Sequence, residues 1–428
     1  MNDTIDEILI QEFGKKEKRF LQECIHCGLC LPTCPTYISN GKEMDSPRGR
    51  LYLIDSVLNG KASIDNIFEK HIKSCLVCRA CETACPSGVE FGHLMETTRA
   101  ALNNAKNPSI VQRLLLKIVI PSHSFLTIIF FLTRFIQRIH LDKLLHVPPF
   151  KFFTSSKLKE LQQSLPSIPK NRFGNSKSQY YQATDKCKGT VALFTGCIMD
   201  HLFPHVHSAT VRILNWNGYN VIIPSNQTCC GALHAHTGDN SSANKLAKKN
   251  NEILLNNKFD YIAINSAGCG SHLKSYIKYN NSGLASKIMD ISELLTLVTL
   301  KSPKSCPIGP VAYDEPCHLL HGQGISSEPK SILNSIPDIN LINLKNADHC
   351  CGSAGSYSLS ETEMSIKLLE KKIEAIKNSG ASLVVTANPG CQIQLNWGAK
   401  RAKLKIEVLH LVELLDKCYR TDPNYLKI

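Results

Sequence analysis

The chain has 428 residues, of which 43% are hydrophobic and 20% are charged, and 19 of them are cysteines. This length and composition are ordinary for a soluble protein of two or three domains. The N-terminus, MNDTIDEILIQEFGKKEKRF, is polar and lacks the apolar core of a signal peptide. We therefore expect a reducing compartment, most simply the cytoplasm, where cysteines bind metals and a disulfide framework is not expected.

The formal net charge of +13 raises the question of nucleic acid binding. The basic residues are scattered and form no run interleaved with aromatic residues, so nucleic acid is not an expected partner. If the cysteines bind metal as thiolates, these sites also add negative charge, which the basic excess would offset in part. Binding of a positively charged face to an anionic membrane surface or to an acidic partner subunit remains an alternative.

Two copies of one cysteine motif lie within residues 1–100, the first predicted domain. The spacing C-x2-C-x2-C-x3-C-P begins at Cys24 and returns 51 residues later at Cys75. It is typical of [4Fe–4S] clusters: three close thiolates bind one cubane, and the fourth, followed by proline, binds the other. We assign one cluster to Cys24, Cys27, Cys30 and Cys85, and the second to Cys75, Cys78, Cys81 and Cys34.

The sequence between the two motifs is helix-like, as in RGRLYLIDSVLNG, and predicts a helical version of the ferredoxin module. Arg48 and Arg50, in DSPRGR, either offset the charge of a cluster or form salt bridges at the surface.

Residues 101–186 are predicted to be a helical connector and a linker. The most apolar stretch is SFLTIIFFLTRFIQRI, whose continuous apolar core is shorter than the roughly 20 residues a spanning helix needs. A helix packed on the protein or on a partner is the ordinary interpretation, and amphipathic contact with a membrane surface is the alternative. Residues 165–185 are rich in turn formers and polar groups, which predicts a linker.

A second, larger repeat spans roughly 190–300 and 310–420. Strands are predicted in TVALFTGC, YNVIIP and FDYIAINSAGC, and again in GPVAYDEPC, INLINL and SLVVTANPGC. Helices are predicted in HSATVRILNWNG, NKLAKKNNEILLNN and ETEMSIKLLEKKIEAIKNSG. This alternation predicts two α/β, Rossmann-like domains with largely parallel sheets, at residues 187–304 and 305–428. The whole chain is therefore expected to be an α+β multidomain protein.

Four cysteines recur in the two large repeats, displaced by 120 to 122 residues. They fall at strand ends or in loops that open helices, where α/β sheets collect ligands and helix N-termini favour thiolates. Each set predicts one site, for an iron–sulfur cluster, for zinc or another structural metal, or for no metal. The sets are Cys197, Cys229, Cys230 and Cys269, and Cys317, Cys350, Cys351 and Cys391. The glycine after each CC pair is expected to let the backbone approach the cofactor.

Two ferredoxin motifs followed by two cysteine-rich CCG domains resemble the iron–sulfur subunit of glycolate oxidase. The segments DSPRGRLYL, DEPCHLLHGQG, CCGSAGSYSL, NPGCQIQL and VLHLVELLD carry this resemblance, which covers nearly the whole chain and is weakest across 101–186. Related architectures occur in the iron–sulfur subunits of lactate utilisation, anaerobic glycerol-3-phosphate dehydrogenase and heterodisulfide reductase.

The resemblance implies an electron-transfer subunit of an oxidoreductase complex. A flavin-containing partner subunit would oxidise glycolate to glyoxylate, and this chain would pass the electrons toward a quinone or another membrane acceptor. Peripheral contact with the inner face of the cell membrane follows as an expectation. No G-x-G-x-x-G follows a strand and no hydrolase pattern appears, so no catalytic residue is assigned. A lactate or glycerol-3-phosphate dehydrogenase subunit, or a heterodisulfide reductase-like subunit, is the alternative.

The chain departs from the wider CCG family in one respect. That family ends each motif in C-x-x-C, whereas this chain has His272 and Gln394 at the fifth cysteine position, which weakens the case for disulfide-reducing chemistry. His272 is a candidate substitute ligand, and His318, His321 and His349 are candidate hydrogen-bond donors or quinone contacts. Cys187, Cys306 and Cys418 lie outside all motifs and are expected to be ordinary thiols.

Overall fold

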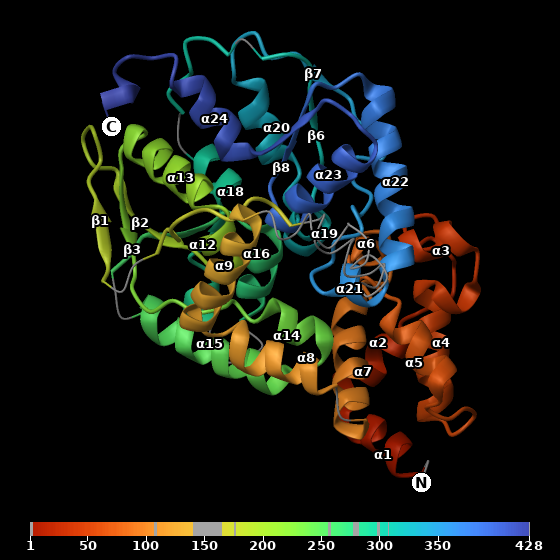
Figure 1. Cartoon of the computed structure of the whole chain (residues 1–428). Helices are drawn as coiled ribbons and strands as arrows, with labels where there is room; N and C mark the ends of the chain where they lie inside the picture. The colour runs from red at the N-terminus through yellow and green to blue at the C-terminus, as the bar shows by residue number, and fades with distance from the viewer. Residues whose placement is uncertain are drawn as a thin grey trace.

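The computed structural model describes residues 3–106, 109–139, 165–174, 177–255, 258–276, 282–297, 300–306 and 308–427. Figure 1 shows an all-helical N-terminal part at one corner of the molecule and two sheet-containing parts that lie against each other. The stretch 140–164 of the predicted connector lies outside the described residues.

The N-terminal part contains helices joined by loops and no strand within its described residues. Ser46 and Asp65 cap two of its helices by accepting the backbone N–H groups of Gly49 and Phe68, as short polar N-cap residues do. Ile54, Ile72 and Leu94 are fully buried in one apolar core between the helices. The helices are α1 (Asp3–Glu12), α2 (Lys15–Gln22), α3 (Pro35–Asn40), η1 (Glu43–Asp45), α4 (Pro47–Leu58), α5 (Asn66–Lys73), α6 (Ala80–Thr83) and α7 (Phe91–Ala105).

The connector contains α8 (Ile110–Leu114), a π-helical turn η2 (Leu115–Val119) and α9 (His123–Arg138). Along α9, Leu126 is buried against the first sheet part, while apolar side chains on the other faces are exposed. Within the described residues, no single helix is long and apolar enough to cross a membrane. The segments Ile110–Val119 and His123–Arg138 reach that length and composition only together, and the chain bends by 113° between them.

The first sheet part has five strands in the order β1-β3-β2-β4-β5, with β2 to β5 parallel and β1 antiparallel at one edge. The strands are β1 (Gln179–Tyr181), β2 (Gly189–Phe194), β3 (Tyr219–Ile223), β4 (Tyr261–Ile264) and β5 (Ile288–Asp290). The helices are α12 (Ile198–Leu202), α13 (Pro204–Trp216), α14 (Ala232–Thr237), α15 (Asn240–Leu255), α16 (Ala267–Lys274), α17 (Ser282–Ala285) and α18 (Ile291–Thr296).

The second sheet part has four parallel strands in the order β7-β6-β8-β9, which repeats the order of β3, β2, β4 and β5. The strands are β6 (Val311–Tyr313), β7 (Leu341–Ile342), β8 (Leu383–Thr386) and β9 (Glu407–His410). The helices are α19 (Cys317–Gln323), α20 (Ser327–Asn334), α21 (Tyr357–Ser360), α22 (Thr362–Ser379), α23 (Pro389–Arg401), α24 (Leu411–Tyr419) and η5 (Tyr425–Lys427).

Each strand predicted in the large repeats is present, but three further strands were not predicted. The short β5 and β9 complete the two sheets, and both run directly into a capped helix, so they carry little periodic pattern of their own. The third, β1, lies within the segment predicted to be a linker. Its sequence QYY pairs with β3 through backbone hydrogen bonds at the edge of the sheet. Such pairing does not require alternating apolar and polar residues, so the sequence contains no strand signal here.

Cys306 and Cys418 form a disulfide, with 4.8 Å between their Cα atoms and a sequence separation of 112. The expectation that both are ordinary thiols is therefore wrong, because folding brings the segment before β6 against the end of α24. Two remote cysteines that belong to no motif give no indication of pairing in the sequence. Cys187 is a free and exposed thiol, as expected.

Candidate metal centres

The first predicted ferredoxin set lines one cavity of the N-terminal part. Cys24, Cys27, Cys30 and Cys85 all face an open cavity of about 450 Å³, together with Cys81. Three of the cysteines come from the loop between α2 and α3, and Cys85 follows α6. Cys85, which the spacing predicts as the fourth ligand, thus lies at the same cavity as three cysteines of the first motif.

The second predicted set lines a neighbouring cavity of about 310 Å³, formed by Cys34, Cys75, Cys78 and Cys81. The backbone N–H of Val77 points at the Cys75 sulfur across 3.4 Å. Because Cys81 borders both cavities, the two share a wall.

Arg48 and Arg50 have different environments, although only one residue separates them. Arg48 borders the first cavity, pairs with Glu43 and donates to the carbonyl of His26. Arg50 is fully buried beside the second cavity, where it donates to the carbonyls of Asp45 and His71. Of the two alternatives for Arg50, a salt bridge at the surface is therefore wrong, because the side chain is buried. Arg50 forms a buried ion pair with Asp45 across 3.6 Å, so this pair lies beside the second set of thiols.

The four cysteines of the first large repeat also meet. Cys197 follows β2 and begins α12, Cys229 and Cys230 lie before α14, and Cys269 lies in the first turn of α16. Their thiols form a hydrogen-bonded series in which Cys197 contacts Cys229, and Cys230 contacts both Cys229 and Cys269. Hydrogen bonds from Cys197 and Cys230 lower the pKa of Cys229 well below its usual value, which favours the metal-binding thiolate.

The second repeat has the same arrangement. Cys317 begins α19, Cys350 and Cys351 lie in the loop before α21, and Cys391 lies in the first turn of α23. The sulfurs of Cys351 and Cys391 are 3.2 Å apart. Hydrogen bonds from Cys350 and Cys391 hold the pKa of Cys351 well below its usual value, although burial opposes this.

The glycine after each CC pair is required by the backbone. Gly231 and Gly352 have φ values of 91° and 85°, a region that residues with a side chain rarely adopt. A Cβ atom on Gly352 would lie 2.5 Å from the carbonyl oxygen of Ser365. The glycine thus permits close approach to α22, a reason that the sequence alone did not indicate.

The residues at the fifth cysteine position are both buried. Gln394 donates to the hydroxyl of Ser365, which donates in turn to the carbonyl of Gly352. Gln394 therefore braces the CCG loop. His272 packs edge-on against Tyr276, and its Nε2 atom lies near the CCG loop at Gly231.

The three histidines near the second repeat's cysteines differ in their contacts. The Nδ1 atom of His318 lies 3.5 Å from the Cys317 sulfur, and the Cys317 charge raises the pKa of His318 against the effect of burial. His321 contacts Thr83 of α6 instead. Burial lowers the pKa of His349.

A buried ion pair beside the second repeat's cysteines was missed by sequence reasoning. The ammonium of Lys372 lies 2.8 Å from the Asp314 carboxylate, and both side chains are 2% exposed. The aligned first repeat has Phe194 and Asn250 instead, so the two sites differ in charge. Asp314, a charged residue at the end of an apolar strand, was the available indication.

These four cysteine sets fit iron–sulfur clusters chemically. Each provides four thiols, which is the ligand number of a cubane. Backbone N–H groups face sulfur at Cys75, Cys229 and Cys350, at 3.4, 3.4 and 3.5 Å, and such hydrogen bonds stabilise cluster thiolates. The ferredoxin sets border cavities, whereas the CCG thiols touch one another.

The second ferredoxin cavity adjoins the second repeat's site. Leu76 and Cys78 pack with Cys317, Cys350 and Tyr357 in one small apolar cluster. The Tyr357 hydroxyl donates to the carbonyl of Ser74 across 2.9 Å, which fixes this contact. The first repeat's cysteines instead share a core with Val119 and Leu126 of the connector.

Comparison with known proteins agrees with this organisation. Residues 20–89 match the family model of a 4Fe-4S dicluster domain, and residues 191–274 and 311–396 each match that of a cysteine-rich domain.

Curated relatives match along nearly the whole chain. A probable glycolate oxidase iron-sulfur subunit of Bacillus subtilis is 34% identical over 92% of this chain and 93% of its own length. The glycolate oxidase iron-sulfur subunit of Escherichia coli is 28% identical over 93% and 94%. A fumarate reductase (CoM/CoB) subunit from Methanothermobacter marburgensis is 27% identical over 95% and 74%. With its dicluster domain, its paired cysteine-rich domains and this full-length similarity, the chain belongs to the family of glycolate oxidase iron–sulfur subunits.

Proposed function

We propose that this chain is the electron-transfer subunit of a glycolate-oxidising complex, working with a flavin-containing partner. One observation carries the proposal: the eight ferredoxin cysteines border two cavities that share a wall, each set completed by a cysteine of the other motif. The similarity to two glycolate oxidase subunits supports the substrate.

In this proposal Cys24, Cys27, Cys30 and Cys85 hold one [4Fe–4S] cluster, and Cys75, Cys78, Cys81 and Cys34 hold the other. Clusters of this kind supply one-electron transfer when bound. The buried guanidinium of Arg50, which is paired with Asp45, lies beside the second set, and Leu76 and Tyr357 pack with Cys78 in an apolar cluster.

The eight CCG cysteines are proposed to hold further metal, as iron–sulfur clusters or as zinc. We infer that both sheets are Rossmann-like, since the strand order 2-1-3-4 is that of doubly wound sheets, which bind ligands at the carboxyl ends of their strands. Cys197 lies three residues beyond the end of β2, and Cys317 lies four residues beyond the end of β6. The shared apolar cluster makes the second repeat's site the neighbour of the ferredoxin part, and the first repeat's site the neighbour of the connector.

We further propose that the connector contacts an anionic membrane surface, where a quinone would accept the electrons. Ile110 and Phe131 leave 80% and 56% of their surfaces exposed, among further exposed apolar residues of α8 and α9. Residues 109–139 contain four basic residues, Arg113, Lys117, Arg134 and Arg138, and no acidic residue. Apolar area combined with positive charge favours binding at an anionic lipid interface. Location on the inner face of the cell membrane, with the rest of the chain in the cytoplasm, follows from this proposal.

The proposal is tested by replacing one cysteine of the second ferredoxin set. Cys78→Ser should abolish glycolate-dependent quinone reduction by the reconstituted complex while the sheet-containing parts stay folded. Cys187→Ser, at an exposed thiol outside the four sets, is the matched control and should keep activity. Normal quinone reduction by Cys78→Ser would contradict the route.

The rival function, direct reduction of a disulfide at a CCG site, is disfavoured by His272 and Gln394 at the fifth cysteine positions. Turnover of a disulfide substrate by the isolated chain with an artificial electron donor would support the rival.

A further inference from the structure

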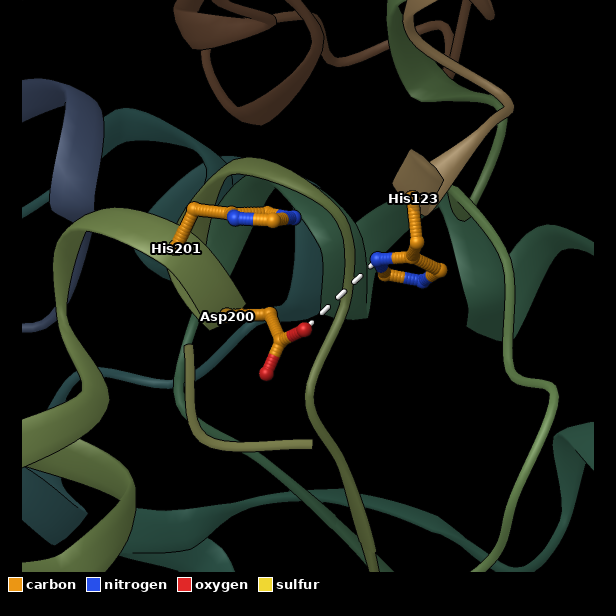
Figure 2. A group of neighbouring side chains, drawn as sticks. All are labelled: His123, Asp200 and His201. Atoms are coloured by element: carbon orange, nitrogen blue, oxygen red, sulfur yellow. Dashed lines mark ion pairs between the residues drawn. The ribbon is translucent and has the colours of Figure 1, made fainter. Parts of the chain in front are cut away.

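Three metal-ligating side chains outside the cysteine sites converge where the connector meets the first sheet part. His123 is the first residue of α9, and Asp200 and His201 lie on α12, which begins directly after Cys197. Figure 2 shows the His201 ring extending over Asp200 toward His123. Asp200 is fully buried and His201 is 5% exposed.

A hydrogen bond of the His123 ring determines which of its two nitrogens carries the proton and which faces Asp200. Its Nε2 atom lies 2.9 Å from the carbonyl oxygen of Gln227, and an imidazole nitrogen meets a carbonyl only as a donor. In the neutral ring the Nδ1 atom therefore carries a lone pair, 3.6 Å from the carboxylate of Asp200. A lone pair facing a carboxylate is repulsive, and a cation between the two groups, like a proton on either of them, removes the repulsion. A histidine whose other nitrogen donates to a backbone carbonyl is also typical of metal ligands.

His201 adds a second nitrogen without a partner. Among the described residues, the buried Nε2 atom of His201 and the Nδ1 atom of His123 have no hydrogen-bond partner. The ring of Phe130 stacks on that of His201 with 5.1 Å between centroids, which holds the imidazole in place. Burial lowers the pKa of His201 to about 4 and also lowers that of His123, which favours the neutral rings. Neutral imidazole is the form that binds metals.

Arg172 is the cation already present at this group. Its guanidinium lies 3.3 Å from the Asp200 carboxylate, and the Gly174 N–H donates to the other carboxylate oxygen across 2.5 Å. The arginine pairs with the carboxylate, but the Nδ1 atom of His123 and the Nε2 atom of His201 still have no hydrogen-bond partner. The Arg172 side chain is 27% exposed, so it has a path to solvent when another cation replaces it.

We propose that His123, Asp200 and His201 bind a divalent transition-metal ion, Zn²⁺ or Fe²⁺, separate from the cysteine sites. One ligand atom from each residue lies within 4.8 Å of the others. Tetrahedral ligands about 2.1 Å from an ion lie roughly 3.4 Å apart, and the His123–Asp200 distance of 3.6 Å is already close to that. Two imidazole nitrogens and one carboxylate suit both ions. The ion joins the start of the connector helix α9 to α12 and so orients the exposed apolar face of α9.

The test uses the full chain, purified anaerobically with its clusters and equilibrated with Zn²⁺. We expect one zinc per chain with nitrogen and oxygen ligands in its X-ray absorption spectrum, in addition to any zinc that the CCG cysteines hold through sulfur. His123→Ala and His201→Ala should each weaken zinc binding at least tenfold while cluster iron and circular dichroism stay unchanged. His205→Ala, at a 53% exposed histidine of the adjacent α13, is the matched control and should bind zinc normally.

Arg172→Gln sharpens the test because the variant removes the competing cation, so zinc should bind more tightly than to the wild type. An iron content lower by one per chain in His201→Ala, from protein purified without added zinc, would identify Fe²⁺ as the natural ion. Equal metal content in wild type, His123→Ala and His201→Ala would overturn the proposal. A zinc spectrum dominated by sulfur and unaffected by these variants would also overturn it, by assigning the zinc to cysteines.

Discussion

At the scale of single residues, the most consequential feature beyond the cysteines is the buried pair of Lys372 and Asp314 beside Cys351. The ammonium also donates to the carbonyls of Asn346 and Ala347, which lead into the CCG loop. Burial raises the pKa of Asp314 and Lys372 opposes that effect, so the carboxylate depends on its partner. The pair therefore links local stability to the second repeat's metal site.

Lys372→Met should lower the free energy of unfolding by about 3–5 kcal/mol, the usual cost of leaving a buried charge unpaired. In Lys372→Met the pKa of Asp314 rises further above its value in the unfolded chain. The free energy of unfolding therefore falls as the pH rises from the unfolded pKa to the folded one. The loss should therefore be smaller at pH 5 than at pH 8 in denaturant titrations. Lys371→Met, at the exposed neighbouring lysine, is the control and should change little. A loss independent of pH would contradict this account of Asp314.

Gly352 allows a second test at this scale. Gly352→Ala should destabilise the protein more than Gly380→Ala, although both glycines have positive φ values, of 85° and 75°. A Cβ atom at Gly380 would have no described neighbour within 4 Å. Gly380→Ala should therefore cost only the free energy of holding a residue with a side chain at positive φ, about 1–2 kcal/mol. Gly352→Ala has the same backbone cost and in addition brings its Cβ atom into collision with the carbonyl oxygen of Ser365. Equal midpoints in thermal unfolding of the two variants would show that the close approach to α22 does not matter.

At the scale of elements, the connector helix α9 is unusual because its apolar side chains face outward. The predicted helix is present, but packing on the protein covers only one side of it within the described residues. Hydrophobic content alone could not separate a buried helix from an interfacial one, because the two differ in what surrounds them.

Phe131→Glu should reduce binding of the protein to vesicles containing anionic lipids at least tenfold, because the variant removes apolar area and places a charge at the interface. The measurement is co-sedimentation with vesicles at several salt concentrations. Tyr52→Glu, which adds the same charge at an exposed aromatic residue of α4, should bind as the wild type does. Unchanged binding by Phe131→Glu would exclude this face as the contact.

At the scale of the whole molecule, the spacing of the motifs predicted more of the sites and strands than the amino-acid composition did. The cysteine spacings led to the sets that the structure brings together, because ligands of one site must follow a fixed geometry along the chain. The repeat predicted the parallel strands β2, β3, β4, β6, β7 and β8, each of which is apolar or repeats an apolar counterpart. The edge strand β1, the ion pair of Lys372 and the His123 group were not predicted, because their partners lie 40 to 78 residues apart in no repeated pattern.

The disulfide between Cys306 and Cys418 is likewise a property of the whole fold. Closing a loop of 112 residues stabilises a folded chain by about 4–5 kcal/mol on the chain-entropy model. Cys418→Ser should therefore lower the unfolding midpoint under oxidising conditions and leave it equal to that of the wild type in excess reductant. Wild-type protein that unfolds identically with and without reductant would contradict a stabilising role.

The central claim is that the ferredoxin cysteines hold two clusters, and one measurement tests it most directly. Iron and acid-labile sulfide are counted in the anaerobically purified chain, with electron paramagnetic resonance of the reduced protein. We predict at least about eight irons per chain, four for each cubane, and about four fewer in Cys78→Ser. Iron above eight that disappears in Cys351→Ser would locate a further cluster in the second repeat. Fewer than about four irons per chain, with zinc in their place, would contradict the assignment of an electron-transfer subunit.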